Sequence, residues 1–240
     1  MGISRETDDI FANTFGSLRQ HVNPQLWASP SLVTFGRQST EGLGKSPEEY
    51  FKGFGFDQVD SLDVSDFEGC SIVHDLNDPV PVQYHQKYHC VFDGGTMEHV
   101  FDIKSALFNA HNLLRAGGVV VHANPVNNQT NHGFYQFSPT LLLGFYGQNG
   151  YRIVRLILTS RIKGGPIQKV LDIGESQALS LALAQRIVFP LSFTSDYLTS
   201  MLFVAVKPEV HRDPVVPQQP FYADRFADQQ FKKYKRILML

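Results

Sequence analysis

Apolar runs, polar turns and amphipathic segments follow one another along the chain in an order that predicts an α/β fold. The clearest unit, Tyr88 to Pro125, contains an apolar run, an Asp-Gly-Gly turn, apolar residues three and four apart, a Gly-Gly pair and a second apolar run. This order predicts two parallel strands joined by a helix that Asp102 caps and that Gly117 and Gly118 end. Ligands of such sheets bind beyond the carboxyl ends of the strands, so we expect the functional site there.

Other segments extend this pattern to a single domain, 1–240. Ser46, Pro47 and Glu49 predict the start of a short helix, because they match a capping box with proline in the first turn. Seven strands are expected, at 31–35, 58–64, 71–74, 88–92, 119–122, 151–158 and 200–206. Three further segments are a lead-in or cover at 1–30, an insertion and candidate lid at 163–197 with a helix at 175–188, and a tail at 209–240 that ends in a helix.

Composition limits the partners of the chain. Apolar residues make up 42% of it and the formal charge is −2, which favours a packed globule and gives no general attraction to nucleic acid or acidic membranes. Cys70 and Cys90 lie in apolar surroundings, which favours free thiols in a reducing compartment. With no signal peptide and no run of about 18 apolar residues, we expect a cytoplasmic protein without a membrane partner. The oligomeric state stays open, a homodimer included.

Four segments, in chain order, resemble motifs of the class I S-adenosylmethionine-dependent methyltransferases. They are SLDVSD at 61–66, HDLNDPVP at 74–81, FDGGTMEHVFD at 92–102 and LLRAGGVVVHANP at 113–125. The last three of these segments, together with NHGFYQFSPTLL at 131–142, are also similar to a group of uncharacterised bacterial proteins of this class. The resemblance implies a Rossmann-like, seven-stranded, mostly parallel sheet with helices on both faces, and S-adenosylmethionine as cofactor.

The same resemblance implies roles for acidic residues at three strand ends. Asp63 would hold the ribose hydroxyls of the cofactor, a task that suits the two oxygens of a carboxylate, with Asp60 as the competing candidate. Asp75 would reach the adenine amino group, and Asp93 with Gly94 would line the methionine side. Aspartates before proline or glycine also form turns without binding a ligand, so both interpretations stay open for Asp75 and Asp93.

The loop after the first expected strand departs from the family pattern. It reads TFGRQSTEGLG, so Gly36 is in place but Arg37, Gln38 and Ser39 stand where glycines are expected. Bulky side chains there either crowd the site or point away from it while the backbone amides still bind. Arg37 is a candidate partner of the cofactor carboxylate. The link at 64–70 is also short for a parallel crossover, which indicates that it lacks a full helix.

Three residues are candidates for catalysis. His132 follows the fifth expected strand in a polar loop, and histidine titrates near neutral pH, so it is the candidate general base. Glu98 and His99 lie at the mouth of the fourth strand and are candidate helpers, although such a pair also braces the following helix. Tyr135 and Tyr146 are candidates for contact with the acceptor or for core packing.

Other chemistries have weaker support. His85 and His89 have the spacing of a helical metal pair, but the glutamate of the zinc-protease motif is missing, so no metal site is expected. The chain lacks a GxSxG elbow, a dinucleotide fingerprint and a Walker loop. We therefore expect methyl transfer to the hydroxyl of a small molecule or sugar. The alternatives are a non-catalytic binding or interaction protein with the methyltransferase fold and, with less support, a sugar-modifying enzyme on a similar sheet.

Overall fold

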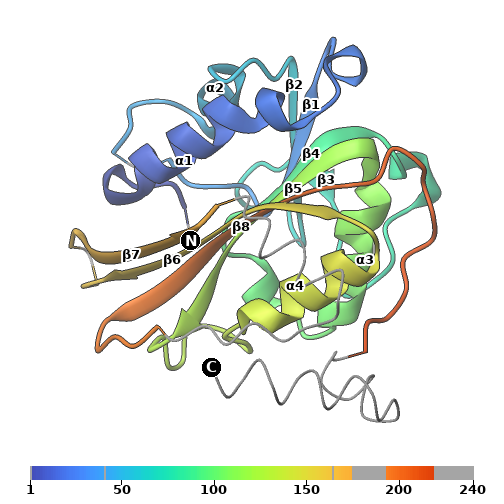
Figure 1. Ribbon diagram of the computed structural model, residues 1–240. Coiled ribbons are helices and arrows are strands. Elements are labelled where there is room, and N and C mark those ends of the chain that lie inside the picture. Colours follow the sequence, from blue (N-terminus) through green and yellow to red (C-terminus); the bar gives the residue numbers. More distant parts are fainter. Residues whose placement is uncertain (1, 41, 164, 175–192, 219–240) are drawn as a thin grey trace, which may run out of the picture.

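A computed structural model describes residues 2–40, 42–163, 165–174 and 193–218 (Figure 1). Within these ranges, eight strands form one sheet in the order β3-β2-β1-β4-β5-β8-β6-β7. The strands are β1 Ser31–Phe35, β2 Gln58–Asp63, β3 Ile72–Val73, β4 Tyr88–Asp93, β5 Leu114–Asn127, β6 Arg152–Arg161, β7 Ile167–Ile173 and β8 Leu198–Val206. The first five strands of this order, β3, β2, β1, β4 and β5, are parallel to one another. Strand β8 is antiparallel to its neighbours β5 and β6, and β7 is antiparallel to β6. The predicted Rossmann-like, mostly parallel sheet is thereby confirmed.

The predicted count of seven strands is wrong because β7 was not expected. All seven of its residues are exposed or half-buried, and among the described strands only β6 pairs with it. An edge strand of this kind lacks the buried apolar alternation by which strands are found in a sequence. The first part of the expected insertion, 163–197, is therefore an extension of the sheet. The helix expected at 175–188 lies outside the described residues, as does the tail from 219 onward.

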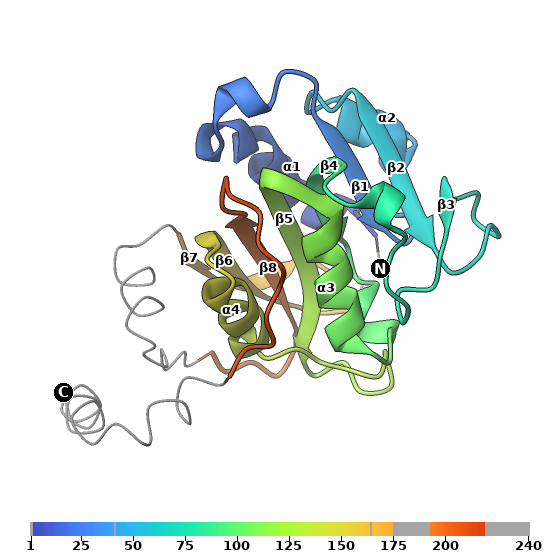
Figure 2. The ribbon, with the colours of Figure 1, turned by 90° about the vertical axis from the view of Figure 1, so that its right-hand side faces the viewer.

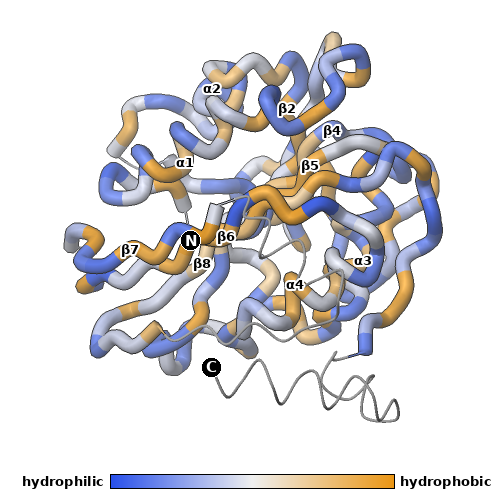
Figure 3. The backbone as a smooth tube through the Cα atoms, in the orientation of Figure 1, coloured by the Kyte–Doolittle hydropathy of each residue, from blue (hydrophilic) through white to orange (hydrophobic). Residues whose placement is uncertain are grey.

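Helices cover both faces of the sheet, as expected (Figure 2). On one face lie α1, Arg5–Ser17, and α2, Pro47–Lys52; on the other lie α3, Ile103–Leu113, and α4, Pro139–Gln148. Each pair covers a separate apolar core, and Figure 3 shows the hydrophobic stretches of the strands between them. Short 3₁₀ turns occur at Leu18–His21, Pro24–Leu26, Val82–Tyr84 and Met97–His99. None of the helices in the described ranges has the length and apolar character needed to cross a membrane.

The N-terminal segment is a helical cover, held to the sheet by aromatic packing. Phe15 of α1 meets Phe51 of α2 and Phe92 of β4 edge to face, with ring centroids 5.1 and 5.3 Å apart. The chain before α1 continues over the loop that follows β1, where Ile3 N donates to Ser39 O at 2.8 Å. Residues 2–17 thus extend from the apolar core to the carboxyl ends of the strands, where the site is expected.

The predicted helix starts are confirmed. Ser46 Oγ accepts from Glu49 N, and Glu49 Oε2 accepts from Ser46 N, which completes a capping box at α2. Asp102 Oδ1 accepts from Ser105 N at the start of α3. The apolar run at 139–148, which forms α4, was not predicted as a helix.

The predicted glycine stop of α3 is wrong. The helix ends at Leu113, and Leu114 is already extended and starts β5. Gly117, with φ of +72°, lies in an irregular stretch of β5 between residues that pair with Tyr88 and Cys90. Carbonyls at the end of α3 and just after it bind Lys207 instead: its Nζ donates to His111 O at 2.7 Å and to Leu114 O, the first residue of β5, at 2.8 Å.

Lys207 makes the stability of the fold depend on pH above neutrality. Its side chain is buried, and burial lowers its pKa from 10.5 to about 7. Between these values the unfolded chain binds more protons than the folded chain, so stability rises with pH. We expect the wild type to gain on the order of 2 kcal/mol relative to Lys207→Met between pH 7 and 10, measured by urea unfolding. If the free energies of unfolding of the two proteins changed equally with pH, this expectation would be contradicted. Lys52→Met, at an exposed lysine, is the matched control.

Candidate functional site

A cavity of about 620 Å³ lies at the carboxyl ends of β1, β2 and β4. Its walls come from the segments that follow these strands, from the turn after β3 and from the N-terminal residues before α1. Of the nine residues proposed from the sequence, five line it: Gly36, Arg37, Asp63, Asp75 and His99. The site lies where the strand pattern predicted it.

Gly36 allows the chain to turn closely between β2 and the segment after β4. Its φ is +65°, its N–H donates to Leu62 O at 2.7 Å, and a Cβ there would lie 2.7 Å from Thr96 Oγ1. Both the conformation and the space therefore require glycine. The same position lies 3.6 Å from Asp63 Oδ2, so the turn and the carboxylate line one part of the cavity.

Asp63, and not Asp60, faces the cavity. Asp63 ends β2, with Oδ2 accepting from Arg37 N at 3.2 Å and Oδ1 accepting from Val64 N at 2.7 Å. Asp60 instead accepts from Tyr88 Oη at 2.7 Å and lies 3.5 Å from Lys87 Nζ. Each carboxylate oxygen of Asp63 keeps acceptor capacity for a ligand hydroxyl.

Two bulky residues replace glycines after Gly36 without filling the cavity. The Arg37 guanidinium forms an ion pair with Glu48 at 3.2 Å and donates to Glu68 O at 2.7 Å. The buried Gln38 amide donates to Phe35 O and lies so close to Gly94 that no Cβ fits there. The Arg37 side chain therefore already has anionic and carbonyl partners.

Asp75 has the geometry of a turn former and also faces the cavity. Its Oδ1 accepts from the backbone and side-chain nitrogens of Asn77 at 2.9 and 2.8 Å, and these hydrogen bonds lower its pKa. Its other carboxylate oxygen stays available at the cavity wall, next to His74 and Leu76.

Asp93 and Gly94 lie beneath the cavity and do not line it. Asp93 is fully buried: Oδ1 accepts from Thr96 N and Met97 N, and Oδ2 accepts from Asn124 Nδ2 at 2.7 Å and from His122 Nδ1 at 3.0 Å. Burial opposes ionisation, but His122, Asn124 and the turn N–H groups outweigh it and lower the pKa of Asp93. Gly94 borders a separate cavity of about 50 Å³ that α1 and β8 also line.

Sequence reasoning missed the polar partners of Asp93. His122 and Asn124, both on β5, are fully buried, and His122 Nε2 lies 2.6 Å from Tyr146 Oη on α4. Since the carboxylate can only accept, His122 donates to it through Nδ1, and Nε2 shares a hydrogen bond with the Tyr146 hydroxyl. The signal was present in VVVHANP, where two polar residues interrupt an otherwise apolar strand. Tyr146 is thus a core residue, and Tyr135 Oη donates to Phe101 O.

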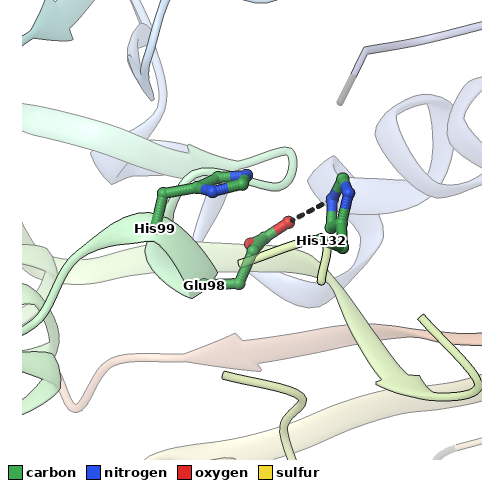
Figure 4. Close-up of side chains that lie close together, drawn as sticks. All are labelled: Glu98, His99 and His132. Atoms are coloured by element: carbon green, nitrogen blue, oxygen red, sulfur yellow. Dashed lines mark ion pairs between the residues drawn. The ribbon is translucent and has the colours of Figure 1, made fainter. Parts of the chain in front are cut away.

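Glu98, His99 and His132 converge at the edge of the cavity (Figure 4). Glu98 Oε1 lies 3.5 Å from His132 Nε2, and the two imidazole rings have centroids 5.1 Å apart. The loop that carries His132 is fixed to the turn after β4, because Phe134 N and Tyr135 N both donate to Glu98 O. Gly133 permits this approach, since a Cβ there would lie 2.7 Å from the same carbonyl oxygen.

The three side chains differ in their protonation. Burial, together with the negative charge of Asp93, raises the pKa of Glu98 to about 7. Partial burial lowers the pKa of both histidines, so both imidazoles are predominantly neutral at pH 7. The cluster therefore offers neutral imidazole nitrogens beside a carboxyl group that titrates near neutrality, which suits proton transfer or cation binding.

The histidine pair considered for a metal does not converge. His85 Nε2 lies 3.1 Å from Val80 O, whereas His89 Nδ1 accepts from Ser31 N at 3.0 Å. Gln86 between them has φ of +52°, so the segment is not helical. Cys70 and Cys90 are free thiols.

Comparison with known proteins gives matches among solved structures only; no protein-family model and no curated protein matches the chain. The chain is similar to Burkholderia thailandensis 1,6-didemethyltoxoflavin-N1-methyltransferase, solved with S-adenosylhomocysteine, at 13% identity and a TM-score of 0.44 over 84% of this chain and 82% of that one. The chain is also similar to StiE O-MT, at 16% identity and a TM-score of 0.47 over 92% of this chain and 80% of that one. Its similarity to the [4+2]-cyclase SpnF is 11% in identity, with a TM-score of 0.48 over 82% of this chain and 80% of that one. The similar structures thus include methyltransferases, the family that the sequence motifs resemble. At TM-scores below 0.5 these likenesses assign no activity to this chain.

Replacing Asp93 tests its place in the structure. Asp93→Asn puts an amide where a carboxylate accepts four hydrogen bonds, so we expect a loss of about 3 kcal/mol of stability at pH 7. Because the folded-state pKa of Asp93 is lowered, its contribution is present above pH 4 and is lost as the pH falls through the folded-state value. Urea unfolding at pH 7 and at pH 3 measures both effects. A loss no larger than that of the exposed Asp57→Asn would contradict this role.

Proposed function

We propose that the chain is an S-adenosylmethionine-dependent methyltransferase that methylates a hydroxyl group of a small molecule or sugar. The observation that carries the proposal is the cavity at the carboxyl ends of β1, β2 and β4, with Asp63 facing into it beside the Gly36 turn. Parallel α/β sheets bind nucleotide ligands at this place. An acidic residue at the end of the second strand suits the two hydroxyls of a ribose.

The residues of the cavity fit this cofactor. The volume of about 620 Å³ lies within the roughly 300–1,000 Å³ range of small-molecule sites. Asp63 would accept from the ribose hydroxyls, and Asp75 would accept from the adenine amino group with Leu76 beside the ring. The amino-acid end would meet the segment after Gly36 together with Gly95 and Thr96, which line the cavity where the resemblance implied Asp93 and Gly94.

Asp93 and Gly94 would then act on the cofactor site indirectly. Asp93 fixes the turn after β4 through Thr96 N and Met97 N, and Thr96 Oγ1 in turn donates to Phe35 O at 2.6 Å. Gly94 leaves the space that the Gln38 side chain occupies. Both residues thereby shape the loop after β1 that borders the cavity.

When bound, the cofactor supplies a methyl group on a positively charged sulfur. His132 would accept the proton of the acceptor hydroxyl, since its lowered pKa leaves the imidazole neutral at pH 7. Glu98, 3.5 Å away, would stabilise the resulting imidazolium. His99 lines the cavity beside this pair and would position the acceptor. The N-terminal residues before α1 would help to exclude water from the cofactor.

Cofactor binding is the first test. Calorimetric titration with S-adenosylmethionine and S-adenosylhomocysteine should give micromolar binding that Asp63→Asn weakens about 10- to 100-fold, because charged hydrogen bonds are lost. Asp60→Asn is the matched control, since Asp60 belongs to the same strand but contacts Tyr88. Folded wild-type protein that binds neither compound would refute the proposal and favour a non-catalytic binding or interaction protein with this fold.

The role of His132 is tested with an acceptor found among hydroxylated sugars and phenols. We expect His132→Gln to lower kcat about 10²- to 10⁴-fold while the Kd for S-adenosylmethionine stays unchanged, because the residue acts on the acceptor. His85→Gln, on the segment before β4, is the control. An unchanged kcat in His132→Gln would show that the base lies elsewhere.

A further inference from the structure

Among the described residues, one oxygen in the Glu98, His99 and His132 cluster makes no hydrogen bond. Glu98 is fully buried, and within these residues its Oε1 lies 3.5 Å from His132 Nε2, which does not form a hydrogen bond with it. The other oxygen, Oε2, lies 3.4 Å from Asn124 Nδ2, the amide that also donates to Asp93. Asn124 therefore orients the carboxyl group so that the unpartnered oxygen points toward His132 (Figure 4).

A buried carboxyl oxygen without a partner costs free energy, which a bound cation would offset. The nearest groups, the imidazoles of His99 and His132, are exposed toward solvent on one side and bring one ring nitrogen each to within 4.8 Å of the other ligand atoms. Ligand atoms around a tetrahedral ion lie roughly 3.4 Å apart, so the exposed rings need to move by only about 1 Å to close around it. Two imidazoles and one carboxylate form a known donor set for divalent transition metals with open coordination positions.

We propose that Glu98, His99 and His132 bind a divalent transition-metal ion of the Zn²⁺, Co²⁺ or Fe²⁺ type. The backbone already holds the three residues together, because the turn after β4 carries Glu98 and His99 and is hydrogen-bonded to the His132 loop through Glu98 O. Asn124 and Asp93 form the outer layer that orients the carboxylate, as such layers do in metal sites. His99 also lines the large cavity, so the open positions of the ion would face the bound acceptor.

The role of this ion in methyl transfer rests on the proposed function, whereas the ion site itself does not. A hydroxyl oxygen bound to the ion would lose its proton to solvent water near neutral pH, because the ion stabilises the alkoxide. The oxygen–carbon bond to the methyl group would form as the carbon–sulfur bond breaks, and the electron pair would stay on sulfur. With the ion bound, His132 is a ligand, and the ion takes over its action on the hydroxyl.

The test is a titration of full-length, chelator-treated protein with Co²⁺, followed by visible absorption, with Zn²⁺ as competitor. We expect one ion per chain at micromolar or tighter affinity, and a loss of about 100-fold or more in Glu98→Gln and in His132→Ala. His85→Ala is the control and should bind as the wild type does. Circular dichroism shows that each variant is folded.

Wild-type binding no tighter than that of folded Glu98→Gln would overturn the ion site. The calorimetric titration with S-adenosylmethionine, made on the same chelated protein, separates the two proposals. Cofactor binding without Co²⁺ binding would refute the ion site and leave the proposed function. Co²⁺ binding at Glu98 and His132 without cofactor binding would support the ion site and refute the proposed function.

Discussion

The buried carboxylate of Asp93 is the interaction on which the site depends. It ends β4, and its two oxygens accept from the turn that follows and from His122 and Asn124 on β5. His122 extends the contact to Tyr146 on α4. One ionised group thus fixes a strand end, the neighbouring strand and, through His122, the helix α4. The turn that it holds carries Thr96, Glu98 and His99, so the shape of the cavity and the place of the cluster both follow from Asp93.

The sequence predicted the parts of the fold that rest on local patterns. The strand at 31–35 and the start of α2 agree with the structure, because an apolar run between turn residues and a capping box are decided within a few residues. The end of α3 was predicted wrongly because its carbonyls bind Lys207, which is more than 90 residues away. The edge strand β7 was missed because half-exposed edge positions carry no clear period.

The position of the candidate site was predicted in the same way. Strand ends placed Asp63 and Asp75 at the cavity, and the loop after the fifth strand placed His132 near its edge, since the carboxyl ends of parallel strands meet at one edge. The roles of these residues stay predictions. The family resemblance favoured Asp63 over Asp60, but it did not show the direction of either side chain, because that direction depends on the pairing of β2 with its neighbours. It also placed Asp93 in contact with the cofactor, whereas its partners on β5 draw the carboxylate into the core. The position of the Gln38 side chain was not predicted either, because it depends on the space beside Gly94, which is distant in the sequence.

Two buried carboxyl groups share one amide donor at this site, and their surroundings separate their chemistry. Asp93 has four donors and a lowered pKa, so it stays ionised and acts on structure. Glu98 has the Asn124 amide at the limit of hydrogen-bond distance, and burial beside Asp93 raises its pKa to about 7. Paired acids with diverging environments commonly divide structural and reactive roles in this way. The fold satisfies the first carboxylate completely and leaves one oxygen of the second directed at two imidazoles. For this reason Glu98, and not Asp93 with its four hydrogen bonds, is the carboxyl group that would take up a proton or bind a cation.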